Sequence, residues 1–281
     1  MVIDSHNHLW LIDSSDLYWL SETDRAAGGV VVRDFGIEEI SQAFNTVGVD
    51  KSVLIQAWNA EEDQLYWLDT ADDNEVLGAV IAFADFADPN VGLTIDKFNR
   101  YSKFRGLRVN GQDKRDPDYL NQADIRRGIK QLSLRDGLTL DLLLKHEDLM
   151  HVPRIAEENP DLPMVLDHLA KPQTSTDGYF EPWASQMEPL RDIPNLKFKI
   201  SGMLTEAGPE PSAGIMRPAV QFMIENYGFE RLMWGSDWPV SLLAGSYKHN
   251  FDTTMAAVGD MTEQQRDMLL GGNAALHYQI P

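Results

Sequence analysis

Residues 51–85 read KSVLIQAWNAEEDQLYWLDTADDNEVLGAVIAFAD, and this stretch decides the fold class. Lys51–Ala57 and Val76–Asp85 are short runs rich in apolar and β-branched residues, and the segment between them has helical spacing. Strands that are apolar on both faces are typical of a parallel sheet covered by helices. The stretch therefore predicts a strand–helix–strand unit in which both strands are buried.

The same alternation recurs along the whole chain. We predict eight strands, at Val2–Leu9, Lys51–Ala57, Val76–Asp85, Phe104–Asn110, Leu138–Leu144, Pro163–Leu169, Leu196–Gly202 and Arg231–Asp237. Eight units in 281 residues average roughly 35 residues each, which is typical of a (β/α)8 TIM barrel. We therefore expect an α/β fold with a single barrel domain over residues 1–281. An open doubly wound sheet is the alternative, although no glycine-rich phosphate loop follows the first strand.

Helix signals lie between the predicted strands. Pro218 suits a first helical turn before Val220–Tyr227, and Thr262 with Gln265 predicts a capping box for the last helix. Two segments rich in Gly, Ser, Thr and Pro, Gln173–Pro182 and Leu204–Pro211, follow strands and are expected to be loops. Loops in that position would cap an active site of this architecture.

Composition narrows the class of partner. With 24 Lys+Arg and 44 Asp+Glu the net charge is −20, which argues against binding to nucleic acid or an anionic membrane. The absence of cysteine excludes disulfides, thiolate zinc sites and Fe–S clusters. The start lacks a signal-peptide pattern, and the most apolar stretch, Val76–Phe86, is about half of the ~20 residues that span a membrane. We expect a cytoplasmic protein acting on a small molecule, as a monomer or a homo-oligomer.

The strongest chemical signal is His6-Asn7-His8 near the end of the first predicted strand. Residues two apart on a strand point to the same side, ~6–7 Å apart, so both imidazoles can converge on one metal ion or one substrate group. A pair of hydrogen-bonded structural histidines is the alternative. Barrel enzymes carry their chemistry at the C-terminal ends of strands, which favours a functional pair and makes His6 and His8 candidate metal ligands.

Asp237 and His168 end two other predicted strands. The eighth strand neighbours the first when a barrel closes, so Asp237 would lie beside His6 and His8, where it could ligate a metal or deprotonate a water. An Asp that only caps the turn before Pro239 is the alternative. His168 faces the same mouth and could bind a carbonyl oxygen or join the metal ligands, unless it is a structural histidine. We predict Asp237 and His168 as catalytic.

Four further residues at strand ends are candidates for substrate binding. Arg108 offers a guanidinium fork for a carbonyl or an anion, while Gln56, Trp10 and Trp238 could line the rim or stack on a ring substrate. Arg108 could instead pair with a barrel carboxylate, and the same holds for Lys199. The remaining histidines are expected to be solvated: His146, His151, His249 and His277.

Seven segments, spread in order over nearly the whole chain, carry a family resemblance. They are Ile3–Trp10, Val53–Ala57, Phe104–Arg108, Leu140–Leu142, Val165–Pro172, Lys199–Gly202 and Trp234–Pro239. In these segments the chain resembles the amidohydrolase superfamily, in its amidohydrolase-related branch of sugar and aromatic-pathway lactonases. It is most similar to the L-fuconolactone and L-rhamnonolactone hydrolases, and more distantly to the 2-pyrone-4,6-dicarboxylate lactonases.

The resemblance implies a distorted barrel that hydrolyses a lactone, with His6, His8, His168 and Asp237 in the active centre. It implies either one divalent metal, with zinc first among the candidates, or a site that works without metal. Close sugar-lactonase relatives often carry a histidine where this chain has Val109, which bears on the substrate. The fifth strand has no histidine, which argues against a binuclear centre.

The hypothesis from the sequence is therefore a lactonase in which Asp237 deprotonates a water. His168, Arg108 or a metal would polarise the carbonyl, and protonated Asp237 would give its proton to the leaving alkoxide. The net charge favours a neutral sugar lactone over a dicarboxylate. A metal-dependent decarboxylase or amide hydrolase on the same scaffold is the first alternative. The second is a barrel that binds a small molecule without turnover.

Overall fold

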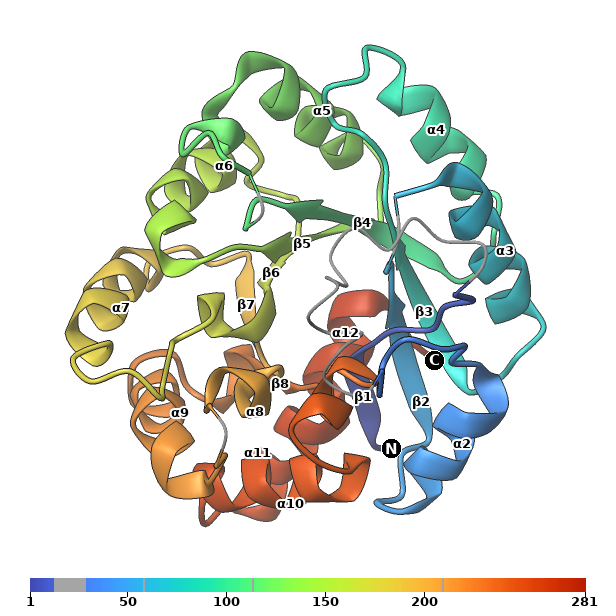
Figure 1. Cartoon of the computed structure of the whole chain (residues 1–281). Helices are drawn as coiled ribbons and strands as arrows, with labels where there is room; N and C mark the ends of the chain where they lie inside the picture. The colour runs from blue at the N-terminus through green and yellow to red at the C-terminus, as the bar shows by residue number, and fades with distance from the viewer. Residues whose placement is uncertain (13–28, 58, 113, 209) are drawn as a thin grey trace.

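Eight parallel strands stand in a ring in the order in which they occur in the chain, β1 to β8 (Figure 1). The computed structural model describes residues 1–12, 29–57, 59–112, 114–208 and 210–281. The strands are β1 (Ile3–Asn7), β2 (Lys51–Ile55), β3 (Leu77–Ala82), β4 (Phe104–Asn110), β5 (Thr139–Leu143), β6 (Met164–Leu166), β7 (Leu196–Ile200) and β8 (Leu232–Trp234). The predicted (β/α)8 barrel is confirmed, with somewhat shorter strands.

Most of the helices surround the strands on the outside of the ring, whereas α12 lies at its centre (Figure 1). The helices are α2 (Ile37–Asn45), α3 (Glu61–Asp72), α4 (Val91–Phe98), α5 (Ala123–Ser133), α6 (Val152–Glu158), α7 (Phe180–Met187), α8 (Met203–Glu206), α9 (Ala213–Tyr227), α10 (Tyr247–Val258), α11 (Glu263–Asp267) and α12 (Asn273–Tyr278). The outer faces of the strands and the apolar sides of these helices form one continuous core.

Both predicted helices are present, and α9 ends at Tyr227 as expected. The Thr262–Gln265 capping box is confirmed. Pro218 lies inside α9, which begins after Ser212, rather than in its first turn. A proline there frees the carbonyl of Gly214, and because Gly214 and Pro218 are both exposed, water can reach it. The predicted loop Leu204–Pro211 starts within α8.

The barrel closes through an irregular seam between β1 and the segment after β8. β1 contains a bulge, since its pairing with β2 shifts between Asp4 and Asn7. Beyond β8, the amide of His8 donates to the carbonyl of Trp238 (2.7 Å), and the amide of Asp237 donates to the carbonyl of His6 (2.8 Å). The ring is therefore complete at its C-terminal mouth, where the predicted site residues lie.

The opposite end of the barrel is filled by the C-terminal segment. Tyr278 and Ile280 pack among inward-facing strand residues such as Ile3 and Val53, and Figure 1 shows α12 within the ring of strands. His277 is 6% exposed against Tyr278, so the expectation that it is solvated is wrong. Burial lowers the pKa of His277 to about 3, which keeps its imidazole neutral.

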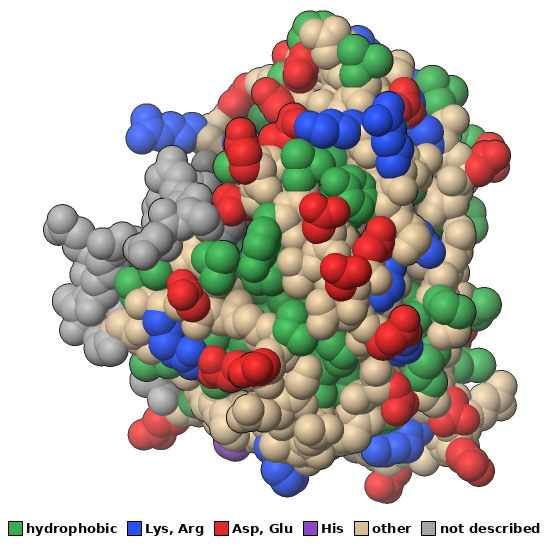
Figure 2. Space-filling view, turned by 90° about the vertical axis from the view of Figure 1, so that its right-hand side faces the viewer, with side chains coloured by type: hydrophobic (Ala, Val, Ile, Leu, Met, Phe, Trp, Pro, Cys, Tyr) green, Lys and Arg blue, Asp and Glu red, His purple; other side chains and the backbone are tan. Residues whose placement is uncertain are grey.

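The surface is acidic without being divided into charged regions on the face that Figure 2 shows. On that face, Asp and Glu side chains are interspersed with Lys and Arg. Among the helices that the structure describes, none is both long enough and apolar enough to cross a bilayer.

Candidate functional site

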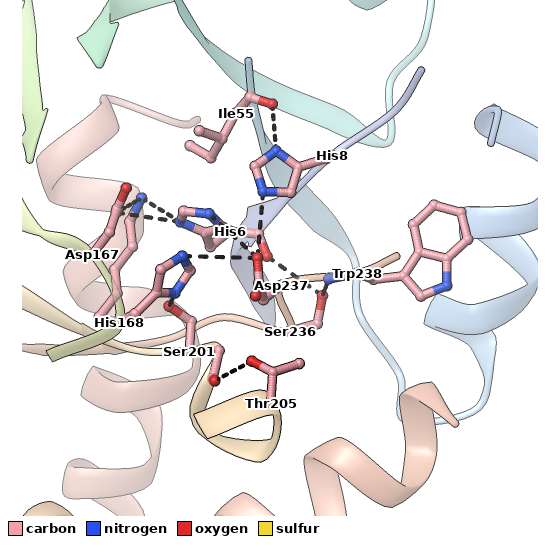
Figure 3. Close-up of polar contacts among 12 residues, drawn as sticks. His6, His8, Ile55, Asp167, His168, Ser201, Thr205, Ser236, Asp237 and Trp238 are labelled. Carbon is pink, nitrogen blue, oxygen red and sulfur yellow. Dashed lines mark hydrogen bonds and ion pairs between the residues drawn. The ribbon is translucent and has the colours of Figure 1, made fainter. Parts of the chain in front are cut away.

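Three imidazoles surround one carboxylate at the C-terminal mouth of the barrel (Figure 3). Oδ1 of Asp237 lies 3.3 Å from Nε2 of His8, 3.7 Å from Nε2 of His6 and 3.8 Å from Nε2 of His168. His6 lies in β1 and His8 directly follows it, while His168 and Asp237 come shortly after β6 and β8. The structure thus brings together the four side chains that the sequence predicts as neighbours.

The bulge in β1 aims both strand-one histidines into the barrel. Ile3 also faces inward, and strict alternation from Ile3 would turn His6 and His8 outward. The extra residue between Asp4 and Asn7 reverses the alternation. Gly235 allows the close approach this needs, because a Cβ on it would lie 2.7 Å from Cβ of His6.

His8 has a fixed tautomer. Its Nδ1 lies 2.9 Å from the carbonyl of Ile55, and a carbonyl oxygen only accepts, so Nδ1 carries the proton. In the neutral ring the lone pair is then on Nε2, which points at Asp237 (Figure 3).

His6 rests on a buried charge network inside the barrel. Its Nδ1 lies 3.3 Å from Oδ1 of Asp167 and 3.3 Å from Nζ of Lys199. Lys199 itself is fully buried between Asp141 (2.5 Å) and Asp167 (3.1 Å). Lys199 therefore neutralises barrel carboxylates, which is the alternative to a substrate-binding role that the sequence left open for it. Burial alone would raise the pKa of Asp167, but Lys199 and His6 hold it well below the usual value.

His168 lies in a left-handed turn built without glycine. Residues 168 to 171 have φ of 54°, 50°, 56° and 53°, and each left-handed non-glycine residue costs roughly 1–2 kcal/mol. The turn thus stores on the order of 4–8 kcal/mol, which the surrounding structure must offset. The indole of Trp183 donates to the carbonyl of Leu169 (2.7 Å), and Leu169 and Ala170 are fully buried. Ser201 bonds Nδ1 of His168 at 2.9 Å.

Asp237 is held by the segment that closes the barrel. Asp4 accepts hydrogen bonds from the amide (2.8 Å) and hydroxyl (2.6 Å) of Ser236 and from the hydroxyl of Tyr247 (2.9 Å). Burial raises the pKa of Asp4 to about 6 despite these bonds. Asp237 itself has φ of 57°. Burial alone would raise the pKa of Asp237, but His168 and His8 lower it well below the ordinary value, so Asp237 is ionised.

The donor set fits one divalent metal ion. Ligand atoms of His6, His8 and Asp237 lie within 4.8 Å of one another. Nε2 of His6 is buried and has no hydrogen-bond partner among the described residues. Burial lowers the pKa of His6 well below its ordinary value, so the ring is neutral and can ligate. Two imidazoles and a carboxylate with room for a further ligand are typical of catalytic zinc.

A cavity of about 280 Å³ opens above the cluster. Its described walls are His8, Gln56, Ala57, Asn59, Arg108, Asn110, Gln112, Leu143, His168, Lys171, Asp237 and Val240. Arg108 donates to the carbonyl of Gln56 (2.6 Å) and lies 3.7 Å from Asp167. Of the predicted substrate-binding residues, Gln56 and Arg108 therefore reach the cavity.

Trp10 and Trp238 lie elsewhere. They are 0% and 2% exposed and pack on either side of Phe35, with ring centroids 5.2 and 5.1 Å from it. In Figure 3 the indole of Trp238 points away from the imidazoles. Neither lines the cavity, and their burial leaves no free indole face for stacking on a ring substrate, which favours the reading of both as packing residues.

Three residues at the site were not singled out from the sequence. Lys171 lines the cavity three positions after His168, a spacing that would place it on the opposite side if the strand continued. Ser201 supports His168, and Gly202 lies against it: a Cβ there would be 2.7 Å from Nδ1 of His168 and 3.2 Å from Oδ2 of Asp237. The sequence gives no local signal that Gly202 must make room for an imidazole from another strand.

Comparison with known proteins places the chain among related sequences and folds. A family model described as Amidohydrolase matches residues 3–280. The chain is 33% identical to an L-fucono-1,5-lactonase of Burkholderia ambifaria, over 99% of this chain and 95% of that protein. It is similar in structure to a zinc-bound amidohydrolase of Burkholderia multivorans (TM-score 0.91, 29% identity, 100% of both chains). A 2-pyrone-4,6-dicarboxylic acid hydrolase of Pseudomonas putida shares the fold (TM-score 0.76, 22% identity, 99% and 97% covered).

Proposed function

The chain belongs to the amidohydrolase family, and on that premise we propose that it hydrolyses the ring ester of a sugar-acid lactone. The observation that carries the proposal is the ionised Asp237, ringed by three imidazoles at the floor of a polar cavity. The 33% identity to an L-fucono-1,5-lactonase over nearly the whole chain supports a lactone as the substrate class.

The proposed reaction begins with a proton transfer to Asp237. Because Asp237 is ionised, this carboxylate can accept a proton from a water that attacks the lactone carbonyl. Negative charge then develops on the carbonyl oxygen. His168 and Arg108 both line the cavity and can donate hydrogen bonds to that oxygen. His168 can do so when Ser201 donates to Nδ1, since Nε2 then carries the proton.

His6, His8 and Asp237 are the residues that would hold a divalent metal, and we propose zinc. When bound, the ion would polarise the carbonyl and lower the pKa of a water. The zinc-bound structure of the Burkholderia multivorans amidohydrolase supports this choice. Asp167 and Lys199 would orient His6, and the carbonyl of Ile55 would orient His8.

The cavity favours a neutral polyhydroxylated substrate over a dicarboxylate. Its amide side chains, Gln56, Asn59 and Gln112 among them, can each donate and accept hydrogen bonds, as sugar hydroxyls require. Both cations of the described wall face a carboxylate: Arg108 lies 3.7 Å from Asp167, and Lys171 lies 3.7 Å from Glu206. Little positive charge is left over for two substrate carboxylates.

A pH-indicator assay tests the proposal, because each opened lactone releases one proton. Purified protein is incubated with L-fucono-1,5-lactone, L-rhamnonolactone and 2-pyrone-4,6-dicarboxylate, and the spontaneous rate is subtracted. We expect turnover of a sugar lactone by the wild type, none above background by Asp237→Asn, and at least ~10-fold lower kcat/KM for the dicarboxylate.

Three outcomes would contradict the proposal in different ways. Release of carbon dioxide from a carboxylated aromatic acid, without lactone opening, would favour a decarboxylase. Hydrolysis of amides alone would favour an amide hydrolase. Saturable binding of sugar lactones without any acid release would favour a binding protein.

A further inference from the structure

Resting on the proposed lactone hydrolysis, we infer that Lys171 is a catalytic residue that protonates the ring oxygen as it leaves. Lys171 lines the same cavity as Asp237, His8 and His168. Its ammonium would therefore meet a lactone whose carbonyl lies over Asp237.

The left-handed turn explains why Lys171 reaches the cavity. The amide of Lys171 donates to the carbonyl of His168 (2.8 Å), which closes a turn of 3₁₀ type. Residues three apart in such a turn eclipse each other, so His168 and Lys171 lie on one side. Leu169 and Ala170, the residues between them, are fully buried on the other side. The turn with unfavourable φ angles thus places the imidazole of His168 and the ammonium of Lys171 in the same cavity.

Other donors on the cavity wall are poorly suited to this step. Arg108 does not release a proton in proteins, and the amides of Gln56 and Asn59 do not either. His168 is already assigned as a donor to the carbonyl oxygen, with its Nδ1 held by Ser201. In the proposed arrangement Asp237 lies beneath the carbonyl carbon, on the side of the attacking water. Lys171 is the one ammonium among the described wall residues.

Glu206 of α8 acts as a positioning residue for Lys171. Oε1 of Glu206 lies 3.7 Å from Nζ of Lys171, and both side chains are largely buried, at 22% and 27% exposure. This separation fixes the ammonium by charge but is too long for a hydrogen bond. The ammonium therefore keeps protons available for a substrate oxygen.

The step balances as follows. Asp237 takes one proton from water, and the water oxygen forms a bond to the carbonyl carbon. When the bond from that carbon to the ring oxygen breaks, the electron pair goes to the ring oxygen, which takes a proton from Nζ of Lys171. The neutral amine of Lys171 recovers a proton from protonated Asp237. The carboxylic acid product loses its remaining proton to solvent.

Substitution of Lys171 tests this role, with lactone opening followed for the wild type in parallel. We expect kcat/KM to fall ~10²–10⁴-fold in Lys171→Ala and to remain low in Lys171→Arg, which keeps the charge but cannot release the proton. Methylammonium should restore part of the activity of Lys171→Ala in a saturable manner. Lys145→Ala is the matched control, since Lys145 also lies near Glu206 and is exposed outside the cavity. It should retain the wild-type rate within twofold.

The outcomes separate this inference from the proposed function. Near wild-type activity in Lys171→Arg would show that the charge alone matters and would overturn the role as an acid. Absence of rescue by methylammonium, or full activity in Lys171→Ala, would also overturn it while leaving the lactonase intact. A wild-type rate no higher than the spontaneous rate would overturn the proposed function, and the inference with it.

Discussion

Replacing Gly202 by alanine should disable the site through a single methyl group. The new Cβ would lie 2.7 Å from Nδ1 and 2.9 Å from Cγ of His168, and 3.2 Å from Oδ2 of Asp237. Ordinary carbon contacts begin near 3.4 Å, so the imidazole must move by at least about 0.7 Å, or Gly202 must move away from it. Gly202 also has φ of 64°, which alanine adopts only with strain.

Both effects can be given a size. A displacement approaching 1 Å at a reacting group costs on the order of 10²-fold in rate, equivalent to about 2.7 kcal/mol of transition-state stabilisation. Left-handed backbone and overpacking together cost about 2–5 kcal/mol of folding stability. We therefore expect Gly202→Ala to fold, to melt at a lower temperature and to lose about 100-fold in kcat/KM for the lactone.

The matched control is Gly48→Ala. Gly48 has φ of 76°, and a Cβ on it would meet nothing within 4 Å, so this variant isolates the backbone strain. Activity by pH indicator and unfolding by circular dichroism are measured for both variants. The reasoning would be refuted if Gly202→Ala kept the activity of Gly48→Ala, because the position of His168 would then not matter for catalysis.

Three further predictions concern the buried charges, the metal and pH. Lys199→Met leaves Asp141 and Asp167 buried without their cation and should lower the free energy of unfolding by about 3–5 kcal/mol in urea titrations; a change below about 1 kcal/mol would contradict the network. Removing metal with a chelator should lower the Tm. Adding zinc at 100 times its Kd should restore about 2.7 kcal/mol to the free energy of unfolding of the wild type, but not of His6→Ala. A Tm that the chelator leaves unaltered would argue against the site. Burial opposes ionisation of Asp237, but His168 and His8 outweigh it and lower its pKa, and burial lowers that of His168 to about 4. The base therefore stays ionised on acidification, and the NMR signal of the Asp237 carboxyl carbon should not titrate from pH 7 to about pH 5; a titration centred near pH 6 would refute this.

The strand pattern was readable from the sequence because both faces of each strand are buried. Runs such as Val76–Asp85 are apolar on both faces of the strand. The order of β1 to β8 in the sheet follows from short connections. The neighbourhood of Asp237 and His6 then follows from barrel closure. The alternation of side chains alone does not explain why His6 faces inward. The bulge between Asp4 and Asn7 determines its direction, and no local sequence pattern predicts that bulge.

What the sequence did not reveal depends on tertiary contacts. Nothing in residues 168–171 favours left-handed backbone, and the turn exists because Trp183 and the burial of Leu169 hold it. Pro218 was misplaced because the N-cap at Ser212, which accepts from the amide of Ile215, carries no acidic partner to reveal it. His277 was misjudged because its burial depends on where the chain end packs.

The packing of that chain end bears on how the protein is made. Ile280 lies so close to β3 that a Cβ on Gly78 would approach it to 2.8 Å, and Tyr278 bonds Asp141 beneath the charge network. A nascent chain therefore cannot close this end of the barrel until residues 278–280 have been synthesised. Until then, the apolar inner faces of the earlier strands remain exposed to water at that end of the barrel.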